Sequence, residues 1–119
     1  MERLKTRADF LRAARGVRRV EGAVTLETCK TPEPAPGAIR VGFTASKKIG
    51  NAVARNRAKR RLRAAAYQLL PLLGRGSHDY VLVARATTGD RPFQDLLSDI
   101  AKALSAAHRK LDHVRADHA

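Results

Sequence analysis

The sequence is poor in the residues that staple a small protein or hold a metal. Among 119 residues it has one cysteine, Cys29, and no tryptophan. A single cysteine cannot form an intramolecular disulfide, and this chain alone cannot build a thiolate zinc site. No apolar run approaches the roughly 18 residues that a membrane span needs, and the N-terminal segment lacks the apolar region of a secretory signal. We therefore expect a cytoplasmic protein with no membrane partner, folded as one domain over residues 1–119.

Acidic residues are missing from the middle of the chain. Between Pro34 and His78 there is no Asp or Glu. The same segment carries the cations Arg40, Lys47, Lys48, Arg55, Arg57, Lys59, Arg60, Arg61, Arg63 and Arg75. The whole chain has 24 Lys and Arg against 11 Asp and Glu, a formal net charge of +13. Such a charge repels itself in a compact fold unless a polyanion neutralises it, so we expect nucleic acid or an anionic surface as the partner.

Three segments have the character of β-strands. Val20–Cys29 alternates apolar and polar residues, and the apolar residues of Ile39–Phe43 share one face of an extended segment. Between them lies the loop Thr31–Gly37, whose prolines cannot pair in a sheet. We predict an antiparallel pair around this loop. Tyr80–Ala84 is apolar throughout, which predicts a central strand buried on both faces.

Three other segments have the signals of amphipathic helices. Thr6 can cap a short helix that places Phe10, Ala13 and Ala14 together on one side. Asn51 can cap a longer helix that is ended by Pro71 and the Gly74-Arg75-Gly76 run. A third helix begins after Pro92. The apolar stripe of the second helix comprises Ala54, Ala58, Leu62, Ala65, Leu69 and Leu73.

Together these elements predict an α/β (α+β) two-layer sandwich with one small mixed sheet and three helices. The expected element order is αβββαβα, which has one strand more than the three segments named above. We expect an ordered core from about residue 5 to residue 112. The polar C-terminal tail, residues 113–119, is expected to fray.

The second predicted helix carries its charges on the face opposite its apolar stripe. Asn56, Arg60 and Arg63 point away from the stripe, and Arg57 and Lys59 flank it. A solvated charged face normally mixes Glu with Lys to gain intrahelical pairs, and this face has no acid. If about six of its residues contact phosphates, affinity for nucleic acid should fall roughly 10³-fold or more between 50 and 200 mM salt.

Composition alone leaves several classes of function open. They are a nucleic-acid-binding module, a protein of the membrane surface and a ribosomal protein that binds rRNA. An interfacial membrane helix places Trp, Phe or Leu beside its lysines, whereas the apolar face here is rich in alanine and suits close packing on a sheet. An architectural DNA-binding protein also fits this composition, and so does a charged face that is merely solvated.

Residues Ser46–Arg63, with Arg55-Asn56-Arg57 at their centre, closely resemble the signature of the bacterial ribonuclease P protein. The resemblance continues in the segments Arg7–Phe10, Arg40–Phe43 and Asp79–Arg85. It covers residues 5 to about 110 and implies an α/β sandwich with an unusual left-handed crossover. General chirality statistics would favour a right-handed one.

The resemblance also implies a division of labour. In that family the RNA subunit performs Mg²⁺-dependent hydrolysis, and the protein binds this RNA and the single-stranded 5′ leader of precursor tRNA. By resemblance, this chain would be a subunit of an endoribonuclease that forms the mature tRNA 5′ end, and it would be inactive alone. Mg²⁺ would be bound by the RNA, with no site on the protein.

Carried over by position, the resemblance assigns RNA contacts to the Arg-Asn-Arg helix and to the turn before it. These residues are Lys47, Lys48, Asn51, Arg55, Asn56, Arg57, Lys59, Arg60 and Arg63. Guanidinium groups suit bidentate contacts with phosphate, and amides at a helix N-terminus attract it. Such contacts position an RNA rather than read its sequence.

Phe10 and Phe43 are the candidates for a groove that holds the leader, since bases of a single strand stack on aromatic rings. For both rings, core packing is the competing interpretation. Family members often carry a second aromatic residue one helical turn after Phe10, where this chain has Ala14. Leader binding should therefore be weaker or rely more on charge. The remaining aromatic residues, Tyr67, Tyr80 and Phe93, are assigned to packing.

Catalysis by the protein itself would need a paired general acid and base. His78 lies in a glycine-flanked loop, and His108, His113 and His118 are expected to be exposed near the C-terminus. Cys29 is expected to be a small apolar residue of a strand, since no thiolate-stabilising motif surrounds it. We therefore predict no catalytic and no metal-binding residue in this chain.

Overall fold

The computed structural model describes the backbone of residues 1–34 and 37–118, and in these ranges the side chains through residue 113. Its elements are β1 (Glu2–Arg3), α1 (Arg7–Ala14), β2 (Val17–Glu21), β3 (Val24–Lys30), β4 (Arg40–Thr44), the 3₁₀ turn η1 (Lys47–Ile49), α2 (Ala52–Leu73), β5 (His78–Ala84) and α3 (Phe93–His118). The predicted order αβββαβα is confirmed, with the short strand β1 added before the first helix. Two residues of the proline loop, Ala35 and Pro36, lie outside the described residues.

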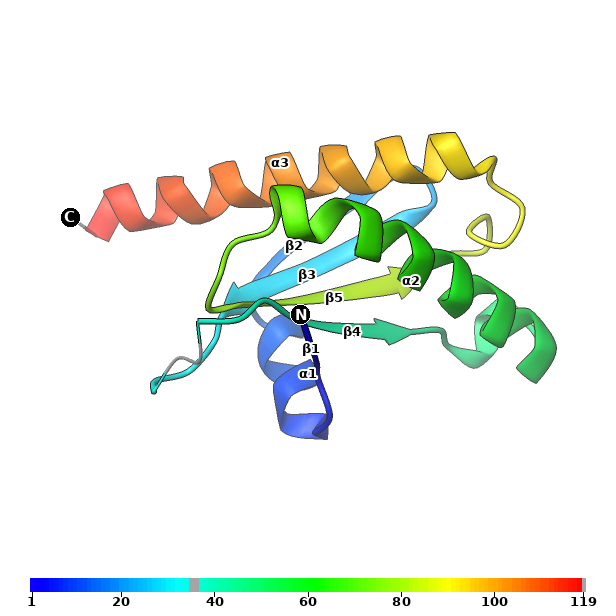
Figure 1. Cartoon of the computed structure of the whole chain (residues 1–119), viewed down its shortest axis with the longest axis horizontal. Helices are drawn as coiled ribbons and strands as arrows, with labels where there is room; N and C mark the ends of the chain where they lie inside the picture. Colours follow the sequence, from blue (N-terminus) through cyan, green and yellow to red (C-terminus); the bar gives the residue numbers. More distant parts are fainter. Residues whose placement is uncertain (35–36, 119) are drawn as a thin grey trace.

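One mixed sheet has the strand order β1-β4-β5-β3-β2 (Figure 1). The prediction of a central, buried strand is confirmed, because β5 pairs antiparallel with β3 and parallel with β4. The predicted antiparallel pairing of the two strands around the proline loop is wrong, since β5 lies between them. Covering both faces of an apolar strand buries the most apolar surface. The free energy gained by this burial outweighs the advantage of the short loop that a local hairpin would have.

The segment that we predicted as one strand, Val20–Cys29, contains a tight turn. β2 ends at Glu21, β3 begins at Val24, and these two residues lie opposite each other in an antiparallel pair. Gly22 in the turn has a φ of +49°, which residues with a side chain rarely adopt. This glycine was the sequence signal for the hairpin that our prediction overlooked.

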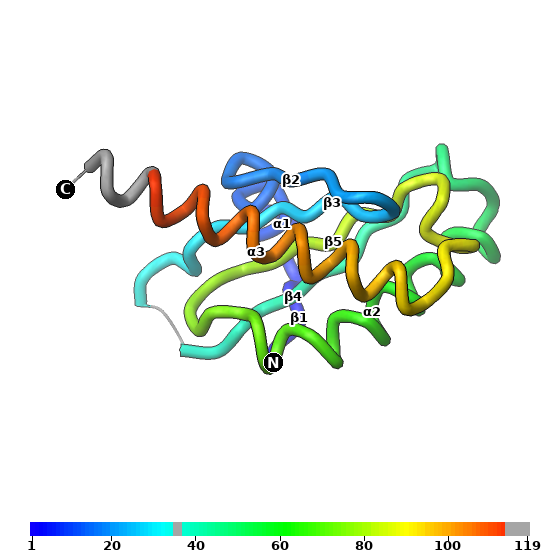
Figure 2. The backbone as a smooth tube through the Cα atoms, turned by 90° about the horizontal axis from the view of Figure 1, so that it is seen from above, coloured from blue at the N-terminus to red at the C-terminus, as the bar shows by residue number. Residues whose placement is uncertain are grey.

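The helices lie on both faces of the sheet. α2 and α3 cover one face side by side, and α1 packs on the other (Figures 1 and 2). α2 connects the parallel neighbours β4 and β5 and crosses in front of the sheet in Figure 1, so this crossover is left-handed. The handedness implied by the family resemblance is thus confirmed, against the general preference for right-handed connections.

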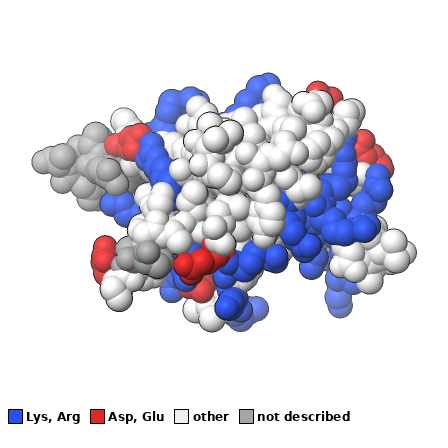
Figure 3. Space-filling model, viewed as in Figure 1, with Lys and Arg blue, Asp and Glu red and all other residues white. Residues whose placement is uncertain are grey.

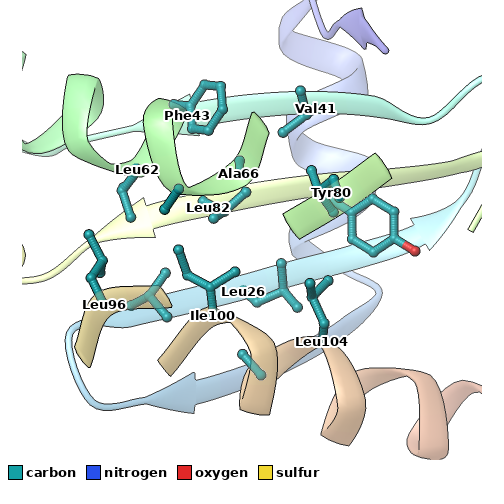
Figure 4. Packing of buried hydrophobic residues seen from close by; sticks show 14 of the residues in the cluster. Leu26, Val41, Phe43, Leu62, Ala66, Tyr80, Leu82, Leu96, Ile100 and Leu104 are labelled. Atoms are coloured by element: carbon teal, nitrogen blue, oxygen red, sulfur yellow. The ribbon is translucent and has the colours of Figure 1, made fainter. Parts of the chain in front are cut away.

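The main core lies between the sheet and the pair α2 and α3. Figure 4 shows Leu26 and Leu82 of the sheet beside Leu62 of α2 and Ile100 of α3. All four side chains are almost fully buried. Each such burial contributes about 1.5–3 kcal/mol relative to exposure, so this layer fixes how α2 sits on the sheet.

α1 packs on the opposite face through a smaller cluster. Its predicted cap is confirmed, since the Thr6 hydroxyl accepts a hydrogen bond from the Asp9 amide at 3.2 Å. Phe10 packs against this cluster, which includes Val81. A Cβ on Gly42 would lie 2.5 Å from the Phe10 ring, so only glycine lets this ring lie directly on β4.

α2 ends at Leu73, where the predicted glycine run begins, and the Gly74 amide closes the last turn on the Leu70 carbonyl. Pro71 lies inside the helix and does not end it. The third helix is longer than predicted. α3 extends to His118, so residues 113–118, which we expected to fray, are helical. No described helix is long and apolar enough to cross a membrane.

Candidate nucleic-acid interface

The N-terminus of α2 is prepared by a short turn. The Asn51 side chain accepts a hydrogen bond from the Ala54 amide at 2.9 Å, which confirms the predicted N-cap. Lys47 and Lys48 in η1 are both exposed just before it. The positive end of the helix dipole and two lysines therefore stand close together in the chain.

The two faces of α2 differ sharply in chemistry. Its buried residues are Ala58, Leu62, Ala65, Ala66 and Leu70. On the other side Asn56, Arg57 and Arg60 are exposed, while Arg55, Lys59 and Arg63 are half-buried at the margins. A shallow depression of about 430 Å³ is lined by Val53, Asn56, Lys59, Arg60 and Arg63. Figure 3 shows Lys and Arg gathered on this side of the molecule.

No ion pair among the described residues involves a cation of α2. Two other cations of the acid-free segment are neutralised within the fold. Arg40 pairs with Asp79 at 2.7 Å, and Arg75 pairs with Asp112 at 2.8 Å. Within this segment, the positive charge that is left without a counterion is thus concentrated on α2 and the turn before it.

Two arginines of α2 hold the loop between β5 and α3. Arg61 donates hydrogen bonds to the carbonyls of Thr88 and Arg91. The Arg57 Nε donates to the Gly89 carbonyl at 3.0 Å. Because carbonyls are neutral, both guanidinium groups keep their positive charge while their positions are fixed.

The candidate leader-binding rings lie on opposite faces of β4. Phe43 belongs to the main core, is 7% exposed and has the Arg3 guanidinium 5.1 Å above its ring. Phe10 is half-buried on the other face, against Gly42. The two rings therefore do not line one groove, and Phe43 has little surface to offer a base.

The other aromatic residues divide between core and surface. Tyr80 is fully buried, as predicted, but Tyr67 is 47% exposed, so its assignment to packing is wrong. Phe93 is half-buried and packs against the main core. It also lines a depression of about 330 Å³ together with Arg57, Arg60, Arg61 and Ala64. The sequence alone does not show this contact, because it depends on how α3 packs beside α2.

Two histidines are less exposed than predicted. His78 opens β5 rather than a loop, is 7% exposed and has its Nδ1 2.9 Å from the Gly76 carbonyl. His108 is half-buried, with its Nε2 2.7 Å from the Tyr80 hydroxyl. Burial, reinforced by the nearby Arg75, lowers the pKa of His108. His108 thus joins α3 to Tyr80 of the sheet, while the His78 ring stacks beside Tyr80 on the same strand. The side chain of His118 lies outside the described residues.

The cysteine and the acids offer no reactive centre. Burial of Cys29, assisted by the negative charge of Asp79, raises its pKa to about 11, so it is a thiol at neutral pH. Within the described residues, no group of three or more His, Cys, Asp or Glu could hold a metal ion.

Comparisons with known proteins point to one family. The family model described as Ribonuclease P matches residues 1–108. The ribonuclease P protein component of Ruegeria pomeroyi is 52% identical over 106 residues, which cover 88% of this chain and 85% of that protein. The corresponding protein of Caulobacter vibrioides is 51% identical over 111 residues, covering 93% and 74%. The solved structure of the Staphylococcus aureus RNase P protein superposes with a TM-score of 0.73 at 27% identity, covering 90% of this chain and 95% of that one.

Proposed function

This chain belongs to the ribonuclease P family and is the protein component of that ribonucleoprotein, and we propose that the outer face of α2 binds the RNA subunit. As a subunit of ribonuclease P, the protein takes part in the endonucleolytic maturation of tRNA 5′ ends. The observation that supports the proposed surface is its uncompensated charge. In the described part of the chain, no carboxylate pairs with any cation of α2.

The exposed centre of this face would make the strongest phosphate contacts. Arg57 and Arg60 present guanidinium groups, which match phosphate oxygens in a bidentate manner, and Asn56 adds a neutral hydrogen bond. The half-buried and flanking residues would extend the contact along the helix. The proposed set is Lys47, Lys48, Asn51, Arg55, Asn56, Arg57, Lys59, Arg60 and Arg63.

We propose that the RNA subunit, and not the protein, holds the Mg²⁺ of the reaction. The ion would supply the hydrolytic chemistry on RNA phosphates. The described residues of this chain do not fit a protein-held site, since no acidic or histidine cluster is present among them. The positive face of α2 would lower the repulsion between RNA phosphates and so reduce the Mg²⁺ concentration that folding of the RNA requires. Because tRNA maturation follows transcription, we also propose a cytoplasmic location.

The precursor tRNA leader is proposed as a second RNA ligand, on the face of the sheet that carries α1. There Phe10 is half-buried, so part of its ring is open to a base. α1 adds the exposed cation Arg7, and its C-cap residue Arg15 adds a second. Phe43 is not part of this proposal, because its ring is buried in the main core on the other face.

The proposed function is tested by reconstitution. The purified protein is mixed with a bacterial ribonuclease P RNA and precursor tRNA at a Mg²⁺ concentration at which the RNA alone is slow. We expect cleavage at the mature 5′ end to rise with protein concentration, and the protein alone to cleave nothing. An absence of stimulation at low salt would contradict the assignment.

The surface itself needs a matched control. Arg60→Glu reverses one exposed charge on α2, and Lys102→Glu reverses one on the exposed side of α3. We expect the first variant to lose most of the stimulation and the second to keep it. Equal losses would mean that only net charge matters and that α2 is not the interface.

A further inference from the structure

Beside the phosphate-binding face lies an aromatic ring that the proposed function does not use. Phe93, the first residue of α3, is only half-buried although it packs against the main core. Its remaining surface lines a shallow, open depression of about 330 Å³ between α2 and α3. The other residues of this depression are Arg57, Arg60, Arg61 and Ala64.

The cations around the ring are arranged in advance. Arg61 is fixed by two backbone carbonyls, and Arg57 uses only its Nε for the Gly89 carbonyl. The terminal nitrogens of Arg57 and the whole guanidinium of Arg60 make no hydrogen bond or ion pair with described residues. Arg57 and Arg61 are thus held in place, while the terminal nitrogens of Arg57 and the guanidinium of Arg60 remain available to a ligand.

The neighbouring residues leave the depression open. Ala64 ends at its Cβ, so the space beside the ring is not filled by the helix opposite. Asp90 and Asp95 are the nearest acids along the chain and are exposed, but neither forms an ion pair with the arginines of this depression. A negatively charged ligand therefore meets no fixed carboxylate partner of these arginines here.

An aromatic surface next to free guanidinium groups is the chemistry that holds an unpaired nucleotide. The base stacks on the ring, and the arginines bind the adjoining phosphates. A base inside a duplex cannot use the ring, because its faces are already stacked on its neighbours. A depression of this chemistry therefore suits single-stranded, bulged or looped RNA.

We infer that Phe93 stacks on one unpaired RNA base while Arg57 and Arg60 bind its flanking phosphates. This inference rests on the proposed RNA-binding role of α2. It adds that the depression beside α2 binds an unpaired nucleotide. The unpaired base is presented either by the RNA subunit or by the precursor leader. The salt dependence of binding distinguishes stacking on Phe93 from the phosphate contacts of the arginines, since a stacking contact releases no counterions.

The test compares Phe93→Leu, which removes the ring but keeps an apolar side chain, with Phe93→Tyr, which keeps the ring. Phe43→Leu serves as the control for lost core packing, because Phe43 is a buried ring outside the depression. Thermal unfolding establishes that each variant is folded at the assay temperature. Dissociation constants are then measured over a series of salt concentrations.

Two arms distinguish the source of the base. The first measures binding to the ribonuclease P RNA alone, and the second measures binding of precursor tRNA, with and without its leader, to the assembled holoenzyme. In one of the two arms, we expect Phe93→Leu to weaken RNA binding about fivefold or more at every salt concentration. The slope of log affinity against log salt should be unchanged. Phe93→Tyr and Phe43→Leu should remain within about twofold of the parent protein.

Two results would overturn the inference while the parent protein still binds RNA and stimulates cleavage. One is unchanged affinity of Phe93→Leu in both arms. The other is a loss accompanied by a smaller salt slope, which would mean that the substitution only displaced the arginines. Failure of the parent protein itself to bind RNA would instead overturn the proposed function.

Discussion

The Arg40 guanidinium donates to both carboxylate oxygens of Asp79, at 2.8 and 2.7 Å, where β4 and β5 lie side by side. The Asp79 side chain is fully buried and also accepts a hydrogen bond from the Thr31 hydroxyl at 2.6 Å. Arg40 reaches Asp9 of α1 as well, at 3.2 Å. One guanidinium therefore links the helix on one face of the sheet to two of its strands.

Breaking this pair should destabilise the fold far more than breaking a surface pair. Asp79→Asn removes the buried carboxylate that binds Arg40 through both oxygens and leaves this mostly buried arginine only the longer pair with Asp9. We expect a loss of about 3 kcal/mol in the free energy of unfolding. Asp112→Asn removes the partner of Arg75 at an exposed site, which should cost less than about 1 kcal/mol. Urea unfolding of both variants checks the difference, and similar losses would show that burial of the pair is unimportant.

Asp9 should make stability depend on pH in the acid range. The hydrogen bond from Arg12 lowers the pKa of Asp9, and the charge of Arg40 adds to this effect. The unfolded state then takes up a proton at a higher pH than the folded state. The stabilisation is present above the ordinary carboxyl pKa of about 4 and is lost as the pH falls through the lower, folded value. We expect Asp9→Asn to be less stable than the parent at pH 6, and the gap in melting temperature to shrink toward pH 3.

His108 should make stability depend on pH in a range closer to neutrality. Because its folded pKa is lowered by burial and by Arg75, the unfolded state binds a proton first as the pH falls through about 6.5. Stability therefore decreases from that pH down to the folded pKa. Urea unfolding at pH 7.5 and pH 5 should show a larger loss for the parent protein than for His108→Gln. Parallel losses would assign the pH dependence to other groups.

Two arginines of the acid-free segment should differ in their effect on RNA binding. Arg60→Ala removes an uncompensated charge and should lower the slope of log affinity against log salt by about one. Arg75→Ala removes a charge that Asp112 already neutralises, so its slope should stay near that of the parent. Equal changes in slope would mean that the RNA covers a much larger surface than α2.

Local signals in the sequence predicted most elements correctly. The caps at Thr6 and Asn51 and the buried strand around Tyr80 depend on neighbours within a few residues, and all three are confirmed. Strand pairing was predicted less well. The insertion of β5 between β3 and β4 joins segments about 40 to 60 residues apart, and no local pattern specifies such a pairing.

The site shows the same division. The positions of Arg57 and Arg60 on the outer face of α2 follow from helical periodicity, which the sequence displays directly. The sequence could not tell that Arg40 is neutralised by Asp79, nor that Phe93 lies beside the cations of α2. Both facts depend on the packing of distant elements.

By itself, the sequence determined the charge of this protein, its helical and extended segments and the family to which it is similar. These properties reside in residue types and in spacings of two to four residues. Only the tertiary structure decided which cations remain without a counterion and which rings stay partly exposed. Burial and ion pairing are properties of surfaces brought together by folding, and their energies exist only once those surfaces meet.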